Sequence, residues 1–308
     1  MTTLDKVVVV TRKTRLTELI ERFNTRAQAK FYIEHAGGDF GEYEREDAAY
    51  RQALDRVRHA VEVGLKVQVL DRDLVPTYTF LPSDAIVTLG QDGLVANTAK
   101  YAAGRPIIGV NPDPDRFDGV LLPFLPDQAR AALGRVLEGR HRVRAVTLAE
   151  ARLGDGQRLL AFNELFVGAR THVSARYRLR WKSHDEAQSS SGVLVATGAG
   201  STGWLSSVYQ MVSAVATFTG GTPGPPLRLD WEDRRLVFIV REPFVSRHSG
   251  ASIVTDVIAA DERLVLESTM PAGGAIFSDG IEADYLAFDS GATASIGAAR
   301  ETANLVMP

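Results

Sequence analysis

The residues best suited to chemistry are Gly90-Gln91-Asp92-Gly93, a glycine turn that contains one carboxylate. It follows the apolar run 85–89 and precedes a helix-like segment at 94–101. Because glycine has no Cβ, such a turn lets backbone N–H groups approach a bound anion. A carboxylate repels phosphate, so Asp92 makes sense there if it takes a proton. The turn therefore suggests a site where a hydroxyl meets a phosphoryl group. The simpler interpretation, a surface Asp-Gly turn, is common in proteins.

A second polar pair, Asn163-Glu164, interrupts the otherwise apolar, strand-like run 159–167. Successive residues of a strand point to opposite faces, so we expect at least one of the pair to face packed side chains and to need a partner. An amide beside a carboxylate suits the hydroxyls of a ribose. One of the two residues could instead be an ordinary outward-facing strand position.

A third candidate is the loop from Thr197 to Trp204, which follows the strand-like run 192–196. Its Gly198-x-Gly200-x-x-Gly203 spacing matches a dinucleotide fingerprint, but the next acidic residue is Asp230 and the surroundings are β-rich, whereas the fingerprint belongs in a βαβ unit. We interpret it as a hydroxyl-lined loop that holds a phosphate or seats a base against Trp204. A glycine-rich turn with Trp204 in the core is the structural alternative.

A late Ser278-Asp279-Gly280 is by itself only a turn signal. Other nucleotide and hydrolase signatures are missing from the sequence: there is no P-loop, no His-Arg-Asp kinase loop and no Gly-x-Ser-x-Gly elbow.

The elements that position these residues belong to a chain of 308 residues, enough for two domains. Net charge is −3, from 35 basic and 38 acidic residues, which gives no sign of a nucleic-acid or anionic-membrane partner. No apolar run approaches a membrane span. The absence of cysteine excludes disulfides and thiol catalysis and fits a cytoplasmic location. The six histidines show no close pair at metal-ligand spacing, so we expect no zinc site.

Residues 1–141 alternate apolar strand-like runs with helix-like stretches, which predicts an α/β, Rossmann-like domain with a mostly parallel sheet. Between them, residues 31–46 carry Gly37, Gly38 and Gly41 and are predicted to form a loop. The strands are expected at 7–10, 66–70, 85–89 and 106–110, and the helices at 15–26, 47–63, 94–101 and 127–137.

Residues 142–285 are predicted to be β-rich, with a β-sandwich or similar stacked-sheet build. A hairpin is expected between 143–148 and 158–167 around Gly154-Asp155-Gly156. Further strands are expected at 173–181, 193–196, 236–240, 251–258 and 264–268. Only 204–215 looks helical in this part. The tail, from about residue 286 to 308, is expected to pack back on the first domain.

Taken together and in this order, the segments resemble the NAD kinase family, within the larger group that includes diacylglycerol and sphingosine kinases and phosphofructokinases. That family carries a Gly-Gly-Asp-Gly turn, an Asn-Glu pair, a Thr-Gly-Ser-Thr-Ala-Tyr-like loop and a late Asp-Gly. The likeness runs from about residue 85 to residue 280. Further details are similar to the mitochondrial-type branch, namely the stretch 110–116, Ser190-Ser191-Gly192, Trp204 and Arg241-Glu242-Pro243.

The resemblance implies an N-terminal Rossmann-like domain, a C-terminal β-sandwich domain and an active site between them. It implies ATP with Mg²⁺ as donor, the metal being carried by ATP, NAD as substrate, and a homodimer or higher oligomer. Asp92 would be the general base that takes the proton from the 2′-hydroxyl of the adenosine ribose of NAD. The remaining roles are donor-phosphate binding by Gly90, Gln91 and Gly93, and substrate binding by Asn163, Glu164, Thr202, Gly203, Trp204, Ser207 and Asp279.

Two departures from the family pattern keep other functions open. Gln91 replaces the second glycine of the turn, and Gly203-Trp204 replaces Ala-Tyr. The alternatives are a related kinase acting on another nucleoside or sugar hydroxyl, a non-catalytic nucleotide-binding sensor on the same scaffold, and an oxidoreductase built on Gly198–Gly203. The sequence also leaves open whether ATP or polyphosphate is the donor, and whether NAD or NADH is the acceptor.

Overall fold

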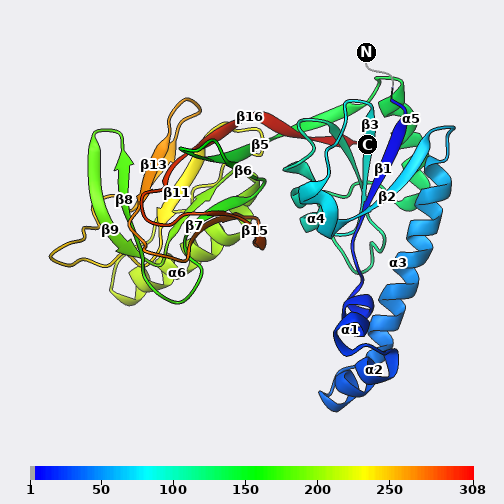
Figure 1. Cartoon of the computed structure of the whole chain (residues 1–308), viewed down its shortest axis with the longest axis horizontal. Coiled ribbons are helices and arrows are strands. Elements are labelled where there is room, and N and C mark those ends of the chain that lie inside the picture. The colour runs from blue at the N-terminus through cyan, green and yellow to red at the C-terminus, as the bar shows by residue number, and fades with distance from the viewer. Residues whose placement is uncertain (1–3) are drawn as a thin grey trace. The chain divides into compact units, whose positions relative to one another are not determined.

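The computed structural model describes residues 4–308 (Figure 1). Apolar strands followed by amphipathic helices build the first part of the chain. The protein divides into two compact units, an N-terminal unit of Met1–Arg144 with Asn304–Pro308 and a C-terminal unit of Ala145–Ala303. Of the tail predicted from residue 286, only Asn304–Pro308 therefore joins the first unit. No helix in the described part of the chain is both long enough and apolar enough to cross a membrane.

The N-terminal unit has a parallel sheet in the order β2-β1-β3-β4, with the end of β16 pairing in parallel beside β4. Its strands are β1 (Lys6–Thr11), β2 (Lys66–Asp71), β3 (Asp84–Leu89) and β4 (Pro106–Val110). Its helices are α1 (Arg15–Phe23), α2 (Arg26–His35), α3 (Phe40–Val61), α4 (Asp92–Ala99) and α5 (Ala129–Leu137), with 3₁₀ turns at Arg72–Thr77 and Pro126–Gln128.

The core of this unit forms because α3 and α5 bury regularly spaced apolar residues against one face of the sheet. Tyr50, Ala53, Val57 and Val61 follow each other at helical spacing on α3 and contact the strand cluster that includes Val87. Helix α4 packs against β3 and β4 (Figure 1). The Rossmann-like α/β prediction is confirmed.

The prediction of a loop at residues 31–46 is wrong. The segment is helical except for a short break after His35, where Gly37 adopts a φ of 81°. Asp39 then caps α3 by accepting a hydrogen bond from the N–H of Gly41. The glycines mark a helix end and the start of the next helix, so α3 begins at Phe40 rather than at Asp47.

The C-terminal unit is an antiparallel sandwich. One sheet has the order β12-β11-β10-β7-β14-β15. The facing layer contains β16, β13, β8 and β9 in that order, with β5 beside β16 and β6 beside β5. The strands are β5 (Arg142–Leu153), β6 (Arg158–Ala161), β7 (Glu164–Ala169), β8 (Ala175–Trp181), β9 (His184–Ser190), β10 (Val193–Ala196), β11 (Leu236–Val240), β12 (Thr255–Ile258), β13 (Leu264–Ser268), β14 (Gly274–Ser278), β15 (Ile281–Ala287) and β16 (Thr293–Met307).

Alternation along the strands builds the sandwich core. On β10, Val193 and Val195 face a cluster shared by both sheets, while Leu194 and Ala196 face helix α6 (Trp204–Phe218). The predicted β-rich, sandwich-like second part is confirmed, as is the hairpin of β5 and β6.

The predicted continuous strand 158–167 is wrong, because β6 and β7 are separate elements with Phe162 and Asn163 between them. Other boundaries also shift. The run 251–258 is strand only over Thr255–Ile258, and β9, β14, β15 and the long β16 come in addition to the predicted strands.

Candidate functional site

The glycine turn of the N-terminal unit lies at the carboxyl edge of the parallel sheet. Thr11, Leu89 and Val110 end β1, β3 and β4 at this edge, where ligands bind in open α/β sheets. Asp92 is the first residue of α4, and its Oδ1 accepts a hydrogen bond of 2.7 Å from the N–H of Leu121. The carboxylate is thereby oriented by a loop that follows β4.

The turn itself has room on one side only. A Cβ on Gly90 would come within 2.9 Å of Leu94 Cδ2, so glycine is needed there, whereas a Cβ on Gly93 would meet nothing within 4 Å. Gln91 precedes α4 without a side-chain capping bond, and its side chain is exposed. The open side is therefore at Gln91 and Gly93, where the first N–H groups of α4 lack partners within the helix.

The side chain of Asn111 fixes the conformation of the loop after β4. Its Nδ2 donates to the carbonyl of Phe117 and its Oδ1 accepts from the N–H of Asp113. Gly119 has a φ of 63°, and a Cβ there would come within 2.4 Å of Asn111 Nδ2. These contacts place Leu121 against Asp92.

In the C-terminal unit, Asp279 holds the break between β6 and β7. Its carboxylate accepts hydrogen bonds from the N–H groups of Phe162 (2.9 Å), Asn163 (2.6 Å) and Glu164 (3.3 Å). Asp279 has a φ of 53°, an uncommon conformation for a residue other than glycine. The structure therefore brings Asp279 together with Asn163 and Glu164, and its oxygens bind their backbone.

The Gly198–Gly203 loop packs on the same break. Thr197 donates from Oγ1 to the carbonyl of Phe162 at 2.6 Å, and its N–H bonds the carbonyl of Asn163. A Cβ on Gly200 would come within 2.1 Å of that carbonyl oxygen, so only glycine allows the approach. Thr197 is not among the site residues predicted from the sequence, although it stands directly after a predicted strand.

Glu164 is the most perturbed carboxyl group of this constellation. Burial, with a smaller contribution from Asp279, raises the pKa of Glu164 to about 7. Its Oε2 is buried and has no hydrogen-bond partner, and a Cβ on Gly203 would lie 3.4 Å from it. A ligand hydroxyl would satisfy this atom, so Glu164 is a candidate binding residue.

Trp204 is half-buried, and it packs against Phe166 and against the apolar cluster beneath α6. The two rings stack with centroids 5.4 Å apart, and the guanidinium of Arg241 lies 4.9 Å from the Trp204 ring centroid. Thr202 and Ser207 are exposed at the start of α6. The four predicted residues Thr202, Gly203, Trp204 and Ser207 thus lie together at the start of α6, and all but Trp204 are open to solvent.

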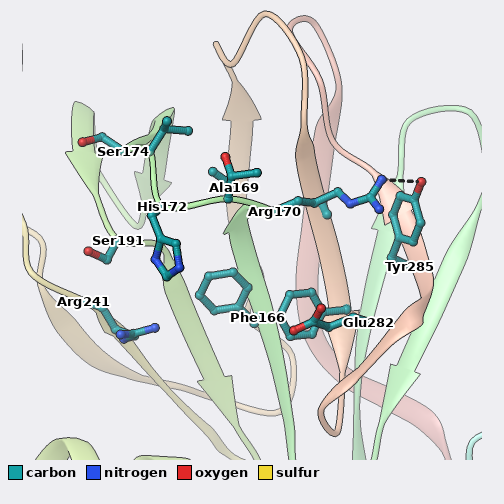
Figure 2. A pocket seen from close by; sticks show the side chains of 13 residues that line it. Phe166, Ala169, Arg170, His172, Ser174, Ser191, Arg241, Glu282 and Tyr285 are labelled. Carbon is teal, nitrogen blue, oxygen red and sulfur yellow. Dashed lines mark hydrogen bonds between the residues drawn. The ribbon is translucent and has the colours of Figure 1, made fainter.

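A cavity of about 680 Å³ adjoins Phe166 in the C-terminal unit. Figure 2 shows Arg241 and His172 on one side of it, Arg170 and Tyr285 on the other, and Phe166 between them. The Tyr285 hydroxyl accepts a 2.9 Å hydrogen bond from Arg170. Aromatic faces beside arginines suit a flat, anionic ligand.

The topology argues against an oxidoreductase fingerprint at Gly198–Gly203. The preceding strand, β10, pairs antiparallel with both β7 and β11, so the loop is not part of a βαβ unit. Among residues 4–308 no group of three or more His, Cys, Asp or Glu side chains could hold a metal ion.

A cluster of charged side chains around the buried carboxylate of Glu46 was not predicted from the sequence. Arg12, Arg15 and Arg116 all bond Glu46 on α3. Arg12 and Arg15 lie two and five residues after the end of the predicted strand 7–10, and basic residues at that edge were the available signal.

Solved structures of kinases share this fold. Yeast NADH kinase complexed with NADH matches with a TM-score of 0.55 and 17% identity, over 100% of this chain and 84% of that chain. The NAD kinase from Archaeoglobus fulgidus in complex with ATP matches with a TM-score of 0.53 and 19% identity, over 98% of this chain and 93% of that chain. The fold is therefore that of these kinases.

The proteins that are similar to this chain in sequence are also named NAD kinases. The chain is 34% identical to the NAD kinase of Heliobacterium modesticaldum over 187 residues, 56% of this chain and 64% of that protein. It is 27% identical to the NAD kinase of Chlorobaculum tepidum over 124 residues, 39% of this chain and 43% of that protein. The matches thus span less than two thirds of either relative's length, and no family model matches. The chain is thus similar to NAD kinases over part of their sequence and shares the fold of the two solved structures.

Proposed function

We propose that the protein is an NAD kinase, which transfers the γ-phosphoryl group of ATP to the 2′-hydroxyl of the adenosine ribose of NAD to give NADP. The observation that carries the proposal is Asp92 at the start of α4, held by the N–H of Leu121. Because that contact engages Oδ1, the proposal assigns proton acceptance to Oδ2. The carboxylate acts as general base, a role that typically contributes about 10²–10⁴-fold.

The donor phosphates bind at the open side of the glycine turn in this proposal. The space at Gly93 and the N–H groups at the start of α4 support it. Phosphoryl transfer needs mainly positioning and electrostatic stabilisation, and backbone N–H groups supply both.

Mg²⁺ arrives with ATP in this proposal. The described residues contain no cluster of His, Cys, Asp or Glu side chains that could hold a metal ion by themselves. We therefore assign no step of the reaction to the metal.

The acceptor binds through the C-terminal unit in this proposal. Glu164, whose buried Oε2 lacks a partner, accepts a hydrogen bond from a ribose hydroxyl, and Asn163 completes the contact. Asp279 contacts the backbone N–H groups of both residues, and Thr197 contacts the carbonyl of Asn163, so the two side chains position the pair. Thr202, Gly203, Trp204 and Ser207 line the adenine side.

A kinase for another nucleoside or sugar hydroxyl is the second candidate. The exposed Gln91 side chain at the open part of the turn motivates it, because it stands where the family has glycine. In addition, we propose a homodimer, a cytoplasmic location and a place in the mitochondrial-type branch, the last on the residues around Asn111, Trp204 and Arg241.

A product assay tests the function. The purified protein is incubated with ATP and Mg²⁺ and with NAD, NADH, adenosine or a sugar, and the phosphorylated product is identified by mass and by phosphorus NMR. We expect NADP carrying a 2′-phosphate. Phosphate on another compound, with none on NAD or NADH, would replace the proposal by the second candidate; nucleotide binding without any product would indicate a sensor.

A further inference from the structure

Three arginine side chains converge on one buried carboxylate in the N-terminal unit. The oxygens of Glu46 lie 3.1 Å from Nη2 of Arg12, 2.5 Å from Nε of Arg15 and 3.0 Å from Nη1 of Arg116. The Glu46 side chain is 4% exposed. Burial alone would raise the pKa of Glu46, but the hydrogen bonds from Arg15 and Arg12 outweigh it and the pKa is lowered. Glu46 is therefore ionised.

The cluster, which we call the arginine cluster, stands at the same sheet edge as the glycine turn. Arg12 directly follows β1, and Arg116 lies in the loop after β4. A Cβ built on Gly90 would lie 3.6 Å from Cδ of Arg12, so this side chain passes against the turn. The two features share one edge although their residues are far apart in sequence.

The arginine cluster has donor groups to spare. Three guanidinium groups carry fifteen N–H donors between them by their chemistry, about five each, and face one carboxylate. Nε of Arg12 is buried without a hydrogen-bond partner, on a side chain only 10% exposed. Arg15 and Arg116 are 45% and 29% exposed, so a ligand can reach them. Unsatisfied donors and excess positive charge are what an anion requires.

Aromatic rings keep two of the arginines in place. Arg15 lies 4.5 Å from the ring centroid of Tyr43, and Arg12 lies 5.4 Å from that of Tyr50. Tyr50 also accepts a hydrogen bond from the N–H of Arg12 and donates one to the carbonyl of Leu89, the last residue before the turn. The guanidinium groups are thus ordered before any ligand binds, which lowers the entropic cost of binding.

We propose that the arginine cluster binds the triphosphate chain of the phosphoryl donor, with Glu46 as the residue that positions the three guanidinium groups. Planar guanidinium groups recognise phosphate oxygens in a bidentate manner, and several around one chain also offset the charge that develops during transfer. The inference rests on the proposed function only for the identity of the donor. A nucleoside triphosphate and inorganic polyphosphate share this chemistry, and the experiment separates them.

The test compares the full-length protein with its Arg15→Gln and Arg116→Gln variants by titration calorimetry, using inorganic tripolyphosphate and ATP with Mg²⁺ as probes. Arg45→Gln is the matched control, because Arg45 is adjacent to Glu46 on α3 and pairs at the surface with Asp39. We expect each site variant to weaken binding of both probes about tenfold or more, as loss of a charge-assisted hydrogen bond does. The control should bind both probes as the wild type does. Loss of tripolyphosphate binding with unchanged ATP binding would assign the cluster to inorganic polyphosphate instead.

Steady-state kinetics provide the second readout, because a merely structural role would affect both substrates. The KM for ATP should rise by a similar factor while the KM for NAD stays as in the wild type. Arg15→Lys and Arg116→Lys keep the charge and serve where a glutamine variant does not fold, and we expect an intermediate loss. Binding of both probes unchanged in folded variants would overturn the proposal. Arginine-dependent binding without NADP formation would uphold it and reject the proposed function.

Discussion

Asp92 and Gln91 are neighbours in sequence with different structural roles. Gln91 precedes α4 and Asp92 is its first residue, but only the Asp92 side chain has a defined hydrogen bond, from the N–H of Leu121. Gln91 is exposed and makes no capping bond. The carboxylate is thus positioned by the fold, while the glutamine is free to meet a ligand.

Glu164 leads to a prediction about pH. Its pKa rises from 4.5 to about 7 on folding, so the native state binds the proton more tightly than the unfolded chain. The free energy of unfolding should therefore fall as pH rises from about 4.5 to about 7, by up to about 3 kcal/mol in total. We expect Glu164→Gln to remove this fall and to be more stable than the wild type at pH 8, as denaturant unfolding would measure.

The same substitution should weaken NAD binding, because it removes the carboxylate to which we assign the contact with a ribose hydroxyl. Glu267→Gln, which removes an exposed carboxylate paired with Arg180, serves as control and should keep the wild-type pH dependence. An unchanged pH dependence in Glu164→Gln would show that Glu164 titrates normally.

At the scale of elements, the break between β6 and β7 is the feature that the sequence concealed. Residues 159–167 have the composition of one strand, and Asp279 is more than a hundred residues away in sequence. Only the folded chain shows three N–H groups turned toward the Asp279 carboxylate instead of a neighbouring strand. By contrast, the strand, turn and helix around Asp92 were predictable because their signals are local.

Asp279→Asn should disturb this break. The amide nitrogen of asparagine cannot accept a hydrogen bond, so at least one buried N–H would lose its partner, at a cost of about 1–3 kcal/mol. We expect a lower free energy of unfolding and a higher KM for NAD. Asp155→Asn, at an exposed hairpin turn, should change stability by about 0.5 kcal/mol or less.

The arginine cluster could not be predicted from the sequence, for the same reason as the contacts of Asp279. Glu46 is thirty or more residues from each of its arginines in sequence, and it lay in a segment predicted to be a loop. A helix that begins at Phe40 was obscured by Gly37, Gly38 and Gly41, whose role as helix ends depends on their neighbours.

At the scale of the whole molecule, the long strand β16 takes part in both units. Its early residues pair with β13, and Asn304 and Leu305 pair with β4. Val306 is fully buried in the core of the N-terminal unit. The sequence predicts that the tail packs back on the first domain. The residue at which the tail joins that domain depends on strand pairing that no local pattern reveals.

The proposed homodimer can be tested on α6. This helix has no charged residue, and its exposed apolar side chains are Met211, Val212, Val215 and Phe218. Light scattering should give twice the chain mass of 33.5 kDa for the wild type and a single mass for Val215→Glu, because a buried charge opposes association. Phe31→Glu, on the exposed side of α2, is the control and should stay dimeric. A wild type that is monomeric at micromolar concentration would contradict the proposal.

The most direct test of the proposed chemistry is the rate at which Asp92→Asn forms NADP from NAD and ATP. Asparagine has nearly the shape of aspartate and cannot take the proton, so kcat should fall by about 10²–10⁴-fold while NAD still binds. Asp127→Asn, at an exposed carboxylate paired with Arg56, should keep the wild-type kcat. An Asp92→Asn protein that forms NADP at the wild-type rate would contradict the assignment of Asp92 as the base.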